Sequence, residues 1–247
     1  MIDTHAHIVK EYYEDIESLV DELKEKNVFK VINCATSITD SKEVIELSKK
    51  TNNYLMPAIG IHPEIVNDFD KLEELEKLIK ENKIIAIGEI GLDYYWNKEN
   101  KKNQKECIIK QLDLAEKYNL PVLVHTRESI QDTFDILKTR KLKGIIHCYS
   151  GSYEMAKEFI KIGYKLGVGG VLTFKNSKLY EVIEKIDLKD ILLETDSPYL
   201  SPEPYRGKQN NPYNIYYVAQ RIAQIKNISL EEVIEQTTKN AYEIFDI

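Results

Sequence analysis

Short apolar runs alternate with longer charged segments along the whole chain. The runs are rich in Ile, Val and Leu, which is typical of strands that are buried on both faces. They occur near residues 1–5, 29–35, 54–61, 83–89, 120–125, 143–148, 164–171 and 190–195. Eight such strands in regular alternation with helices predict an α/β fold, the closed (β/α)8 TIM barrel.

Most segments between the runs carry apolar residues at helical spacing. Leu, Ile and Val recur every three or four positions in residues 15–26, 72–82, 105–120 and 152–163, and Gly163 is the expected C-cap of the last of these helices. Their Glu- and Lys-rich faces need no function beyond contact with water. Residues 213–247 predict two or three extra C-terminal helices, which we expect to cap the outer ring of the barrel.

Length and composition agree with one barrel. The chain has 247 residues, close to the roughly 250 typical of this fold, so we expect a single domain over residues 1–247. Hydrophobic residues make up 43% and charged residues 30%, which excludes a disordered chain. The three cysteines have no CxxC spacing, which disfavours disulfides and thiolate zinc sites. Without a leader or a membrane-length apolar run, we expect a soluble, cytoplasmic protein that makes no membrane contact.

Polar residues with metal-binding chemistry stand at the ends of the predicted strands. Imidazole and carboxylate groups bind Zn²⁺, Mn²⁺ and related divalent ions. A parallel barrel gathers the carboxyl ends of its strands around one mouth, so residues far apart in sequence can meet there. The candidate metal ligands are His5, His7, Glu89, His125, His147 and Asp196.

Local spacing supports the first three of these ligands. His5 and His7 are two positions apart on a strand, so both side chains point the same way and can chelate one ion. Glu89 follows the apolar run KIIAIG, where an unpaired carboxylate is rarely buried. Gly88 and Gly91 remove side-chain bulk around it. We interpret Glu89 as the carboxylate that bridges two metal ions.

The other three ligands have plausible structural alternatives. A single histidine at the end of an apolar strand is more often a hydrogen-bonded core residue than a ligand. His125 and His147, however, end neighbouring strands at equivalent positions. Asp196 could instead cap a helix, but the Ser-Pro-Tyr that follows it does not resemble a helical first turn. The coincidence of all six favours the metal centre.

The net charge of −7 differs from the basic footprint of a tight nucleic-acid binder. Bound divalent cations would reverse the sign of the field locally. The acidic composition therefore argues against tight, processive binding to duplexes. It permits binding of a short stretch of nucleic acid near the metals.

Nine motifs together resemble one family along nearly the whole chain. They are MIDTHAH, GIHP, GEIGLDYY, LPVLVHTR, HCYSG, GGVLTFKNS, LLETDSPYL, PEPYRGKQNNP and TTKNAYEIF, and they resemble the TatD family of metal-dependent deoxyribonucleases. The resemblance implies a TIM barrel of the metal-dependent hydrolase superfamily that hydrolyses phosphodiester bonds, described as exonuclease action on single-stranded or damaged DNA ends. It places the metal ligands on the same six residues. Gln104 and Gln111 match the family, but Cys107 stands where a large apolar residue is common.

The predicted mechanism is hydrolysis assisted by two divalent ions, Mg²⁺, Mn²⁺ or Zn²⁺, held about 3.5–4 Å apart. Metal coordination makes hydroxide available near neutral pH, and the ions neutralise charge on the phosphate oxygens. Asp196 and Glu89 are the catalytic candidates: Asp196 orients the water and accepts its proton, and Glu89 bridges the ions.

Three charged or titratable residues are candidates for holding the substrate. His62, in GIHP, could donate to a phosphate oxygen or could be a turn histidine fixed by the following proline. Arg206 and Lys208 lie after the last strand, where TIM barrels frequently bind phosphate. Arg206 is the first choice because guanidinium binds phosphate in a bidentate way. Both residues could also be solvated loop charges.

Residues 94–96, Tyr-Tyr-Trp, form an aromatic cluster just after Glu89. Such residues stack unpaired bases, and Tyr95 is the stacking candidate, although loop aromatics also simply cover a barrel's rim. We expect DNA as the substrate, a monomer and no obligate protein partner.

Two other functions use the same fold. A metal-dependent amidohydrolase or lactonase acting on a small molecule shares the barrel and the HxH start, but many of these enzymes bridge their metals with a modified lysine where this chain has Glu89. A non-enzymatic scaffold would leave clustered carboxylates and imidazoles without compensation. Metal-dependent turnover discriminates between enzyme and scaffold.

Overall fold

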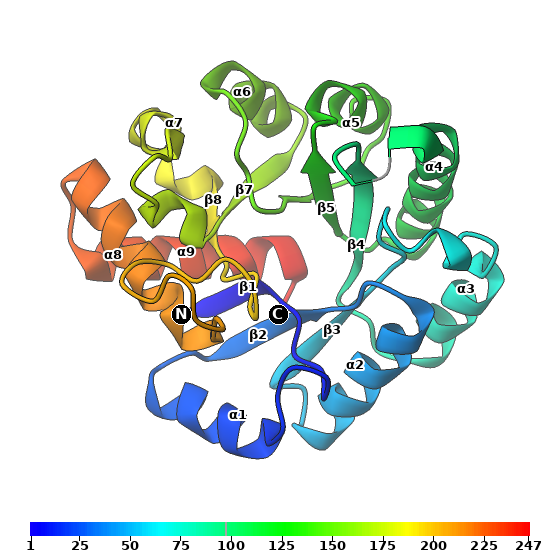
Figure 1. Ribbon diagram of the computed structural model, residues 1–247, viewed down its shortest axis with the longest axis horizontal. Coiled ribbons are helices and arrows are strands. Elements are labelled where there is room, and N and C mark those ends of the chain that lie inside the picture. The colour runs from blue at the N-terminus through cyan, green and yellow to red at the C-terminus, as the bar shows by residue number, and fades with distance from the viewer. Residues whose placement is uncertain (97) are drawn as a thin grey trace.

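Eight parallel strands form one sheet in chain order, each paired with the next, and the (β/α)8 prediction is confirmed. The computed structural model describes residues 1–96 and 98–247. Figure 1 shows the strands in the middle and the helices in a ring around them. The strands are β1 (Ile2–Ala6), β2 (Lys30–Cys34), β3 (Leu55–Ile59), β4 (Ala86–Asp93), β5 (Val122–Arg127), β6 (Gly144–Ile146), β7 (Tyr164–Val168) and β8 (Ile191–Leu193).

Backbone contacts between β1 and the residues after β8 close the barrel. Ala6 and Ser197 form a parallel bridge. The N–H of His7 donates to the carbonyl of Ser197 at 2.7 Å, and the N–H of Asp196 donates to the carbonyl of His5 at 2.9 Å. The seam of the barrel therefore aligns three of the candidate ligands.

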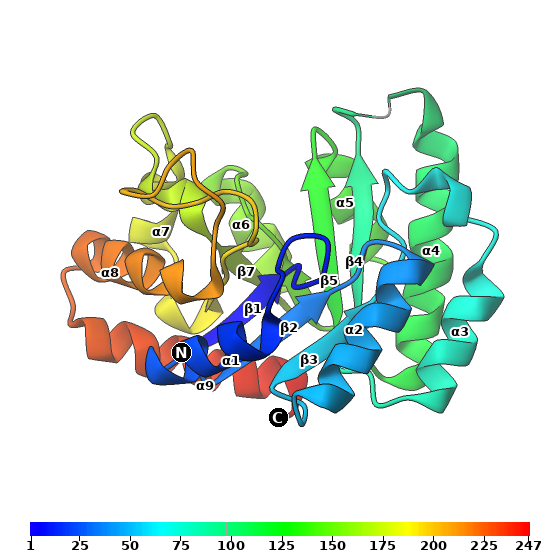
Figure 2. The ribbon, with the colours of Figure 1, turned by 60° about the horizontal axis from the view of Figure 1, so that its bottom comes forward.

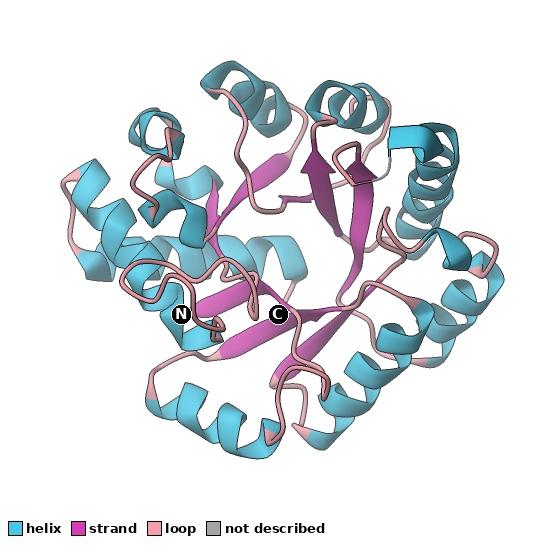
Figure 3. Ribbon diagram, viewed as in Figure 1, coloured by secondary structure: helices cyan, strands magenta, loops and turns pink. Residues whose placement is uncertain are grey.

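The helices lie outside the strands, as Figure 3 shows. All four helices predicted from apolar spacing are present, although the third begins four residues earlier than expected, at Lys101. Gly163 follows the end of its helix with a φ of +96°, as expected of a C-terminal glycine. The helices are α1 (Ile16–Glu25), α2 (Ile38–Lys50), α3 (Leu72–Glu81), α4 (Lys101–Tyr118), α5 (Ile130–Leu137), α6 (Tyr153–Lys161), α7 (Leu179–Lys185), α8 (Ile215–Lys226) and α9 (Leu230–Phe245).

Five 3₁₀ turns lie in the connections of the described chain: η1 (Val66–Asp68), η2 (Lys98–Asn100), η3 (Gly170–Thr173), η4 (Leu188–Asp190) and η5 (Pro212–Asn214). None of the helices in the described part of the chain has the length and apolar character needed to span a bilayer.

The last helix closes one end of the barrel. We expected the C-terminal helices in the outer ring, but α9 lies beneath the strands in Figure 2. Its buried side chains at Ala241, Ile244 and Phe245 pack in one cluster with inward-facing strand residues. We call this part of α9 the floor of the barrel, because it shields the apolar side chains of the strands from water. The shielded side chains include Ile2, Ile32, Met56, Ile85, Leu123, Ile145 and Leu192.

Candidate metal centre

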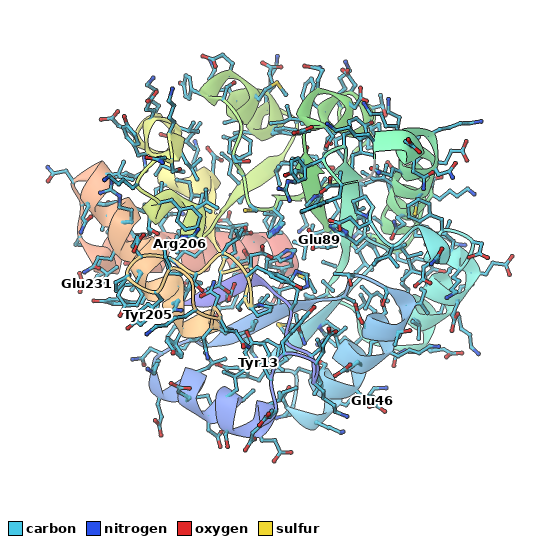
Figure 4. The ribbon with its side chains drawn as sticks, viewed as in Figure 1. Tyr13, Glu46, Glu89, Tyr205, Arg206 and Glu231 are labelled. Carbon is cyan, nitrogen blue, oxygen red and sulfur yellow. The ribbon has the colours of Figure 1, made fainter. Side chains whose placement is uncertain are left out.

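The carboxyl ends of the strands surround a cavity of about 740 Å³. All five histidines of the chain and both candidate catalytic carboxylates lie in or directly beneath this cavity. Figure 4 shows Glu89 near the middle of the ring of strands. The topology therefore brings together residues that are almost two hundred positions apart in sequence.

One group of donor atoms comes from β1, β4 and the segment after β8. The Nε2 atoms of His5 and His7 lie 3.2 Å apart. Oε2 of Glu89 lies 3.2 Å from Nε2 of His5 and 3.4 Å from Nε2 of His7. Oδ1 of Asp196 lies 3.4 Å from Nε2 of His7. Four ligands in a tetrahedron with bonds of about 2.0–2.1 Å are separated by roughly 3.3 Å, so this donor set fits a divalent cation.

A second group surrounds the other oxygen of Glu89. Oε1 lies 2.9 Å from Nδ1 of His125, 3.6 Å from Nε2 of His62 and 3.7 Å from Nε2 of His147. Nε2 of His147 also lies 3.5 Å from Oδ1 of Asp196. Glu89 thus presents one oxygen to each group, which is the arrangement expected of a bridging carboxylate.

Burial and opposite charges shift the pKa values of these groups in different directions. Burial acts to raise the pKa of Glu89, but the imidazoles, His5 first among them, bring it well below its usual value. Burial acts to lower the pKa of His125, but hydrogen bonds that the carboxylates of Asp93 and Glu89 accept from its ring raise that pKa to about 9. Burial lowers the pKa of His62 to about 3, which keeps that imidazole neutral near pH 7.

Asp93 contacts the ring of His125 on the side away from Glu89 and was not predicted from the sequence. Oδ2 of Asp93 lies 3.0 Å from Nε2 of His125. When one ring nitrogen of a histidine binds a metal, a carboxylate hydrogen-bonded to the other ring nitrogen fixes the orientation of the ring and raises its basicity. Asp93 stands four positions after Glu89 on β4, so strand periodicity places both on one side. That spacing was the signal that could have identified it.

Glu194 has a similar relation to His147 and was also missed. Its Oε1 accepts the N–H of Cys148 at 2.6 Å and lies 3.0 Å from Nδ1 of His147. The contact with His147 is close, but its angles are not those of a hydrogen bond. A Cβ at Gly167 would lie 2.1 Å from Oε2 of Glu194. The glycine therefore makes room for this buried carboxylate.

The two glycines that flank Glu89 have a different role from the one expected. A Cβ at Gly88 would lie 2.6 Å from the Cβ of Leu123, and a Cβ at Gly91 would lie 2.0 Å from the carbonyl oxygen of His125. Both neighbours are on β5. The glycines allow β4 to approach β5 closely, so that Glu89 and His125 can meet.

The predicted substrate-binding residues occupy different places. His62 lines the cavity, with its ring centroid 4.6 Å from that of His125. Arg206 and Lys208 are not among the described residues that line it. The guanidinium of Arg206 lies 3.8 Å from the ring centroid of Phe174, and Figure 4 shows Arg206 to one side of Glu89. Phosphate binding by Arg206 and Lys208 stays a prediction. The phosphate that they bind would have to lie outside the cavity, in a part of the substrate away from the candidate metal site.

The aromatic cluster divides into buried and exposed members. Tyr94 is buried, and its hydroxyl donates to Asp132 at 2.7 Å. Tyr95 is 45% exposed and Trp96 is 62% exposed, and Trp96 lines the cavity. Of these two exposed rings, Trp96 is the one that lines the cavity and can stack on a base there.

Arg127 was not identified from the sequence. It is the only Arg or Lys among the described residues that line the cavity. It follows His125 by two positions on β5, so strand periodicity could have placed it beside the metal centre.

Comparisons with known proteins agree with this geometry. The family model described as TatD related DNase matches residues 2–246. The chain is 39% identical to the uncharacterized metal-dependent hydrolase YabD of Bacillus subtilis, over 100% of this chain and 99% of that protein. It is 30% identical to human deoxyribonuclease TATDN3, over 99% and 94%. The crystal structure of YjjV, a TatD homologue from Escherichia coli, superposes with a TM-score of 0.93 at 30% identity, covering 100% of this chain and 98% of that one.

Proposed function

Because the chain belongs to the TatD-related DNase family of metal-dependent hydrolases, we propose that it hydrolyses phosphodiester bonds in DNA and shortens single-stranded or damaged ends. The observation that carries the proposal is the division of the two oxygens of Glu89 between two groups of donor atoms. The name of the human relative, a deoxyribonuclease, supports the choice of substrate.

The donor atoms suit two divalent ions. His5, His7 and Asp196 would hold one ion together with Oε2 of Glu89. His125 and His147 would hold a second ion together with Oε1 of Glu89. Bound ions of this kind polarise the phosphoryl group and lower the pKa of a bound water to about 7.

Asp196 is the proposed proton acceptor. Its side chain is 13% exposed and lines the cavity, whereas that of Glu89 is 4% exposed. Burial acts to raise the pKa of Asp196, but His147 and His7 outweigh it, so the carboxylate is ionised at neutral pH. An ionised carboxylate at the cavity wall can orient a water molecule and take up its proton.

His62 is proposed to contact the substrate. Because its imidazole is neutral near pH 7, one ring nitrogen carries a hydrogen that can be donated to a phosphate oxygen. Nδ1 of His62 accepts the N–H of Glu64 at 3.2 Å, so the hydrogen belongs on Nε2, the atom that faces Glu89.

The test is degradation of end-labelled single-stranded DNA. Metal-stripped protein should be inactive, and addition of Mg²⁺, Mn²⁺ or Zn²⁺ should restore stepwise shortening from one end. The Asp196→Asn variant should lose this activity while still binding metal, because the amide cannot accept a proton.

Two outcomes would contradict the proposal. Full turnover of Asp196→Asn at wild-type metal content would exclude the proton-transfer role. A metal-loaded protein that leaves DNA intact but opens small lactones or amides would identify the amidohydrolase or lactonase function instead.

A further inference from the structure

We propose that Tyr95, Trp96 and Arg127 form a stacking platform that binds the unpaired nucleotide next to the scissile bond. Arg127 would contact the phosphate of this unpaired nucleotide, and Trp96 would stack on the base of the same nucleotide. The proposal rests on the phosphodiesterase function proposed above and adds a specificity site to it. It differs from the position expected from the sequence, which placed the phosphate contact on Arg206.

The guanidinium of Arg127 lies over the ring of Tyr95 and is available to bind an anion. Its guanidinium carbon lies 4.1 Å from the ring centroid of Tyr95 and 5.4 Å from that of Trp96. The side chain of Arg127 makes no ion pair or hydrogen bond among the described residues, and Glu64 is a nearby opposite charge. A guanidinium stacked on a ring keeps its N–H groups in one plane, where they match two phosphate oxygens. The residue is exposed, so a phosphate can reach it.

The aromatic part of the platform is fixed to the metal centre. Oδ1 of Asp93 accepts the N–H of Tyr95 at 2.8 Å and that of Trp96 at 2.9 Å. Oδ2 of the same carboxylate contacts His125. The rings of Tyr95 and Trp96 pack edge to face, with centroids 4.7 Å apart. One side chain therefore sets the position of the platform relative to the candidate ligands.

These groups recognise an unpaired nucleotide because they need an open base face. Stacking on an aromatic ring is tolerant of base identity, whereas a paired base in a duplex already has both faces covered. The other charged groups that line the cavity include Glu64, Glu89 and Asp196. Carboxylates repel a polyanion. A single cationic side chain at the mouth therefore favours binding of a short nucleic-acid segment over binding of a long one.

Trp96 reports on the platform directly, because it is the only tryptophan of the chain. Addition of a short oligothymidylate to the metal-free protein should quench its fluorescence, since a stacked base quenches indole emission. An oligonucleotide with an abasic residue next to the end should bind without that quenching. This measurement needs no catalysis, so it tests the platform even if DNA is not cleaved.

Kinetics provide the second test. Trp96→Ala and Arg127→Met should each raise KM for a single-stranded oligonucleotide about tenfold and leave kcat within about twofold. Hydrolysis of methyl p-nitrophenyl phosphate, a diester without a base, should fall less in both variants than hydrolysis of the oligonucleotide. On the abasic oligonucleotide, Trp96→Ala should have no further effect. The matched controls are Arg221→Met on α8 and Tyr242→Ala on α9, both remote from the cavity lining.

Each failure has its own signature. If oligothymidylate binds without quenching, or if Trp96→Ala and Arg127→Met cleave oligonucleotides with an unchanged KM, the platform proposal is wrong. If the wild type hydrolyses neither DNA nor the small diester, the phosphodiesterase proposal is wrong. Quenching by oligothymidylate would then still support the platform as a nucleotide-binding site.

Discussion

The carboxylate of Asp93 lies against the imidazole of His125 on the side opposite Glu89. Oδ2 of Asp93 is 3.0 Å from Nε2 of His125, while Nδ1 of the same ring is 2.9 Å from Oε1 of Glu89. His125 is therefore clamped between two carboxylates. Only one ring nitrogen is left to face the candidate metal site.

Replacement of Asp93 by Asn should weaken metal binding. The amide keeps an oxygen for the N–H groups of Tyr95 and Trp96 but loses the charge behind His125. Loss of such a partner typically costs about 10- to 100-fold in metal affinity or activity. Competition with a chelator gives the affinity, and Asp135→Asn on the exposed face of α5 is the control. Wild-type affinity in Asp93→Asn would show that the contact does not tune the site.

Metal stoichiometry should follow the division of donors around Glu89. Wild-type protein should bind two equivalents of Zn²⁺. His125→Ala should retain one, because the group around His5 and His7 is intact, and Glu89→Gln should weaken both sites. Elemental analysis after dialysis measures this, with the surface variant Glu154→Gln as the control. Complete loss of metal in His125→Ala would mean that the two groups do not bind independently.

Gln111 should contribute strongly to stability. Its buried side chain accepts the N–H of Ile61 at 2.8 Å and donates to the carbonyl of Ile61 at 3.0 Å. Gln111→Leu leaves both backbone groups unpaired, at a cost of about 1–3 kcal/mol each. Because about 1 kcal/mol shifts Tm by about 2–4 °C in a protein of this size, calorimetry should record a fall of several degrees. The exposed variant Gln131→Leu should change Tm little, and an equal fall in both variants would contradict this account.

Asp68 should make the free energy of unfolding depend on pH in the acidic range. Its Oδ2 accepts the N–H of Ile38 at the start of α2, and its Oδ1 pairs with Lys71 at 2.6 Å. Burial acts to raise the pKa of Asp68, but Lys71 and Ile38 lower it below its usual value. The folded pKa thus lies below the unfolded value of about 3.9. The stabilisation is complete above that value and is lost as the pH falls through the folded pKa.

The variant Asp68→Asn should therefore be less stable than wild type near pH 7, and the difference should shrink below about pH 4. Urea unfolding at several pH values measures the free energy of unfolding. Asp70→Asn, at the neighbouring exposed carboxylate, should show no such trend. A constant difference between Asp68→Asn and wild type at every pH would contradict the linkage.

The order of the strands and the convergence of the polar residues were predictable from sequence. Apolar runs set the strands, and polar residues at strand ends have only one place to meet in a parallel barrel. The separation of His5 and His7 by two positions was enough to predict that both rings face one point, because strand geometry is regular.

The partners of the candidate ligands were less predictable. The spacing of four positions between Glu89 and Asp93 on β4 was a usable signal, whereas the contact of Glu194 with His147 crosses strands, which no local pattern specifies. Arg206 was the first choice because loops after the last strands of such barrels often bind phosphate, and Arg127 was not identified. In the structure, the guanidinium of Arg206 stacks on Phe174, a contact that depends on loop conformation. The floor formed by α9 was missed because an amphipathic helix does not indicate which surface it will cover.

That floor has a consequence for biosynthesis. The inward-facing aliphatic side chains at the amino ends of the strands belong to one cluster with Ala241, Ile244 and Phe245. A ribosome makes α9 after all eight strands, so the nascent barrel carries an uncovered apolar base until this helix emerges. Exposed surface of this kind attracts chaperones and promotes aggregation. The apolar base of the barrel is therefore shielded only when Ala241, Ile244 and Phe245 have been synthesised. This base lies at the end of the barrel opposite the candidate metal centre.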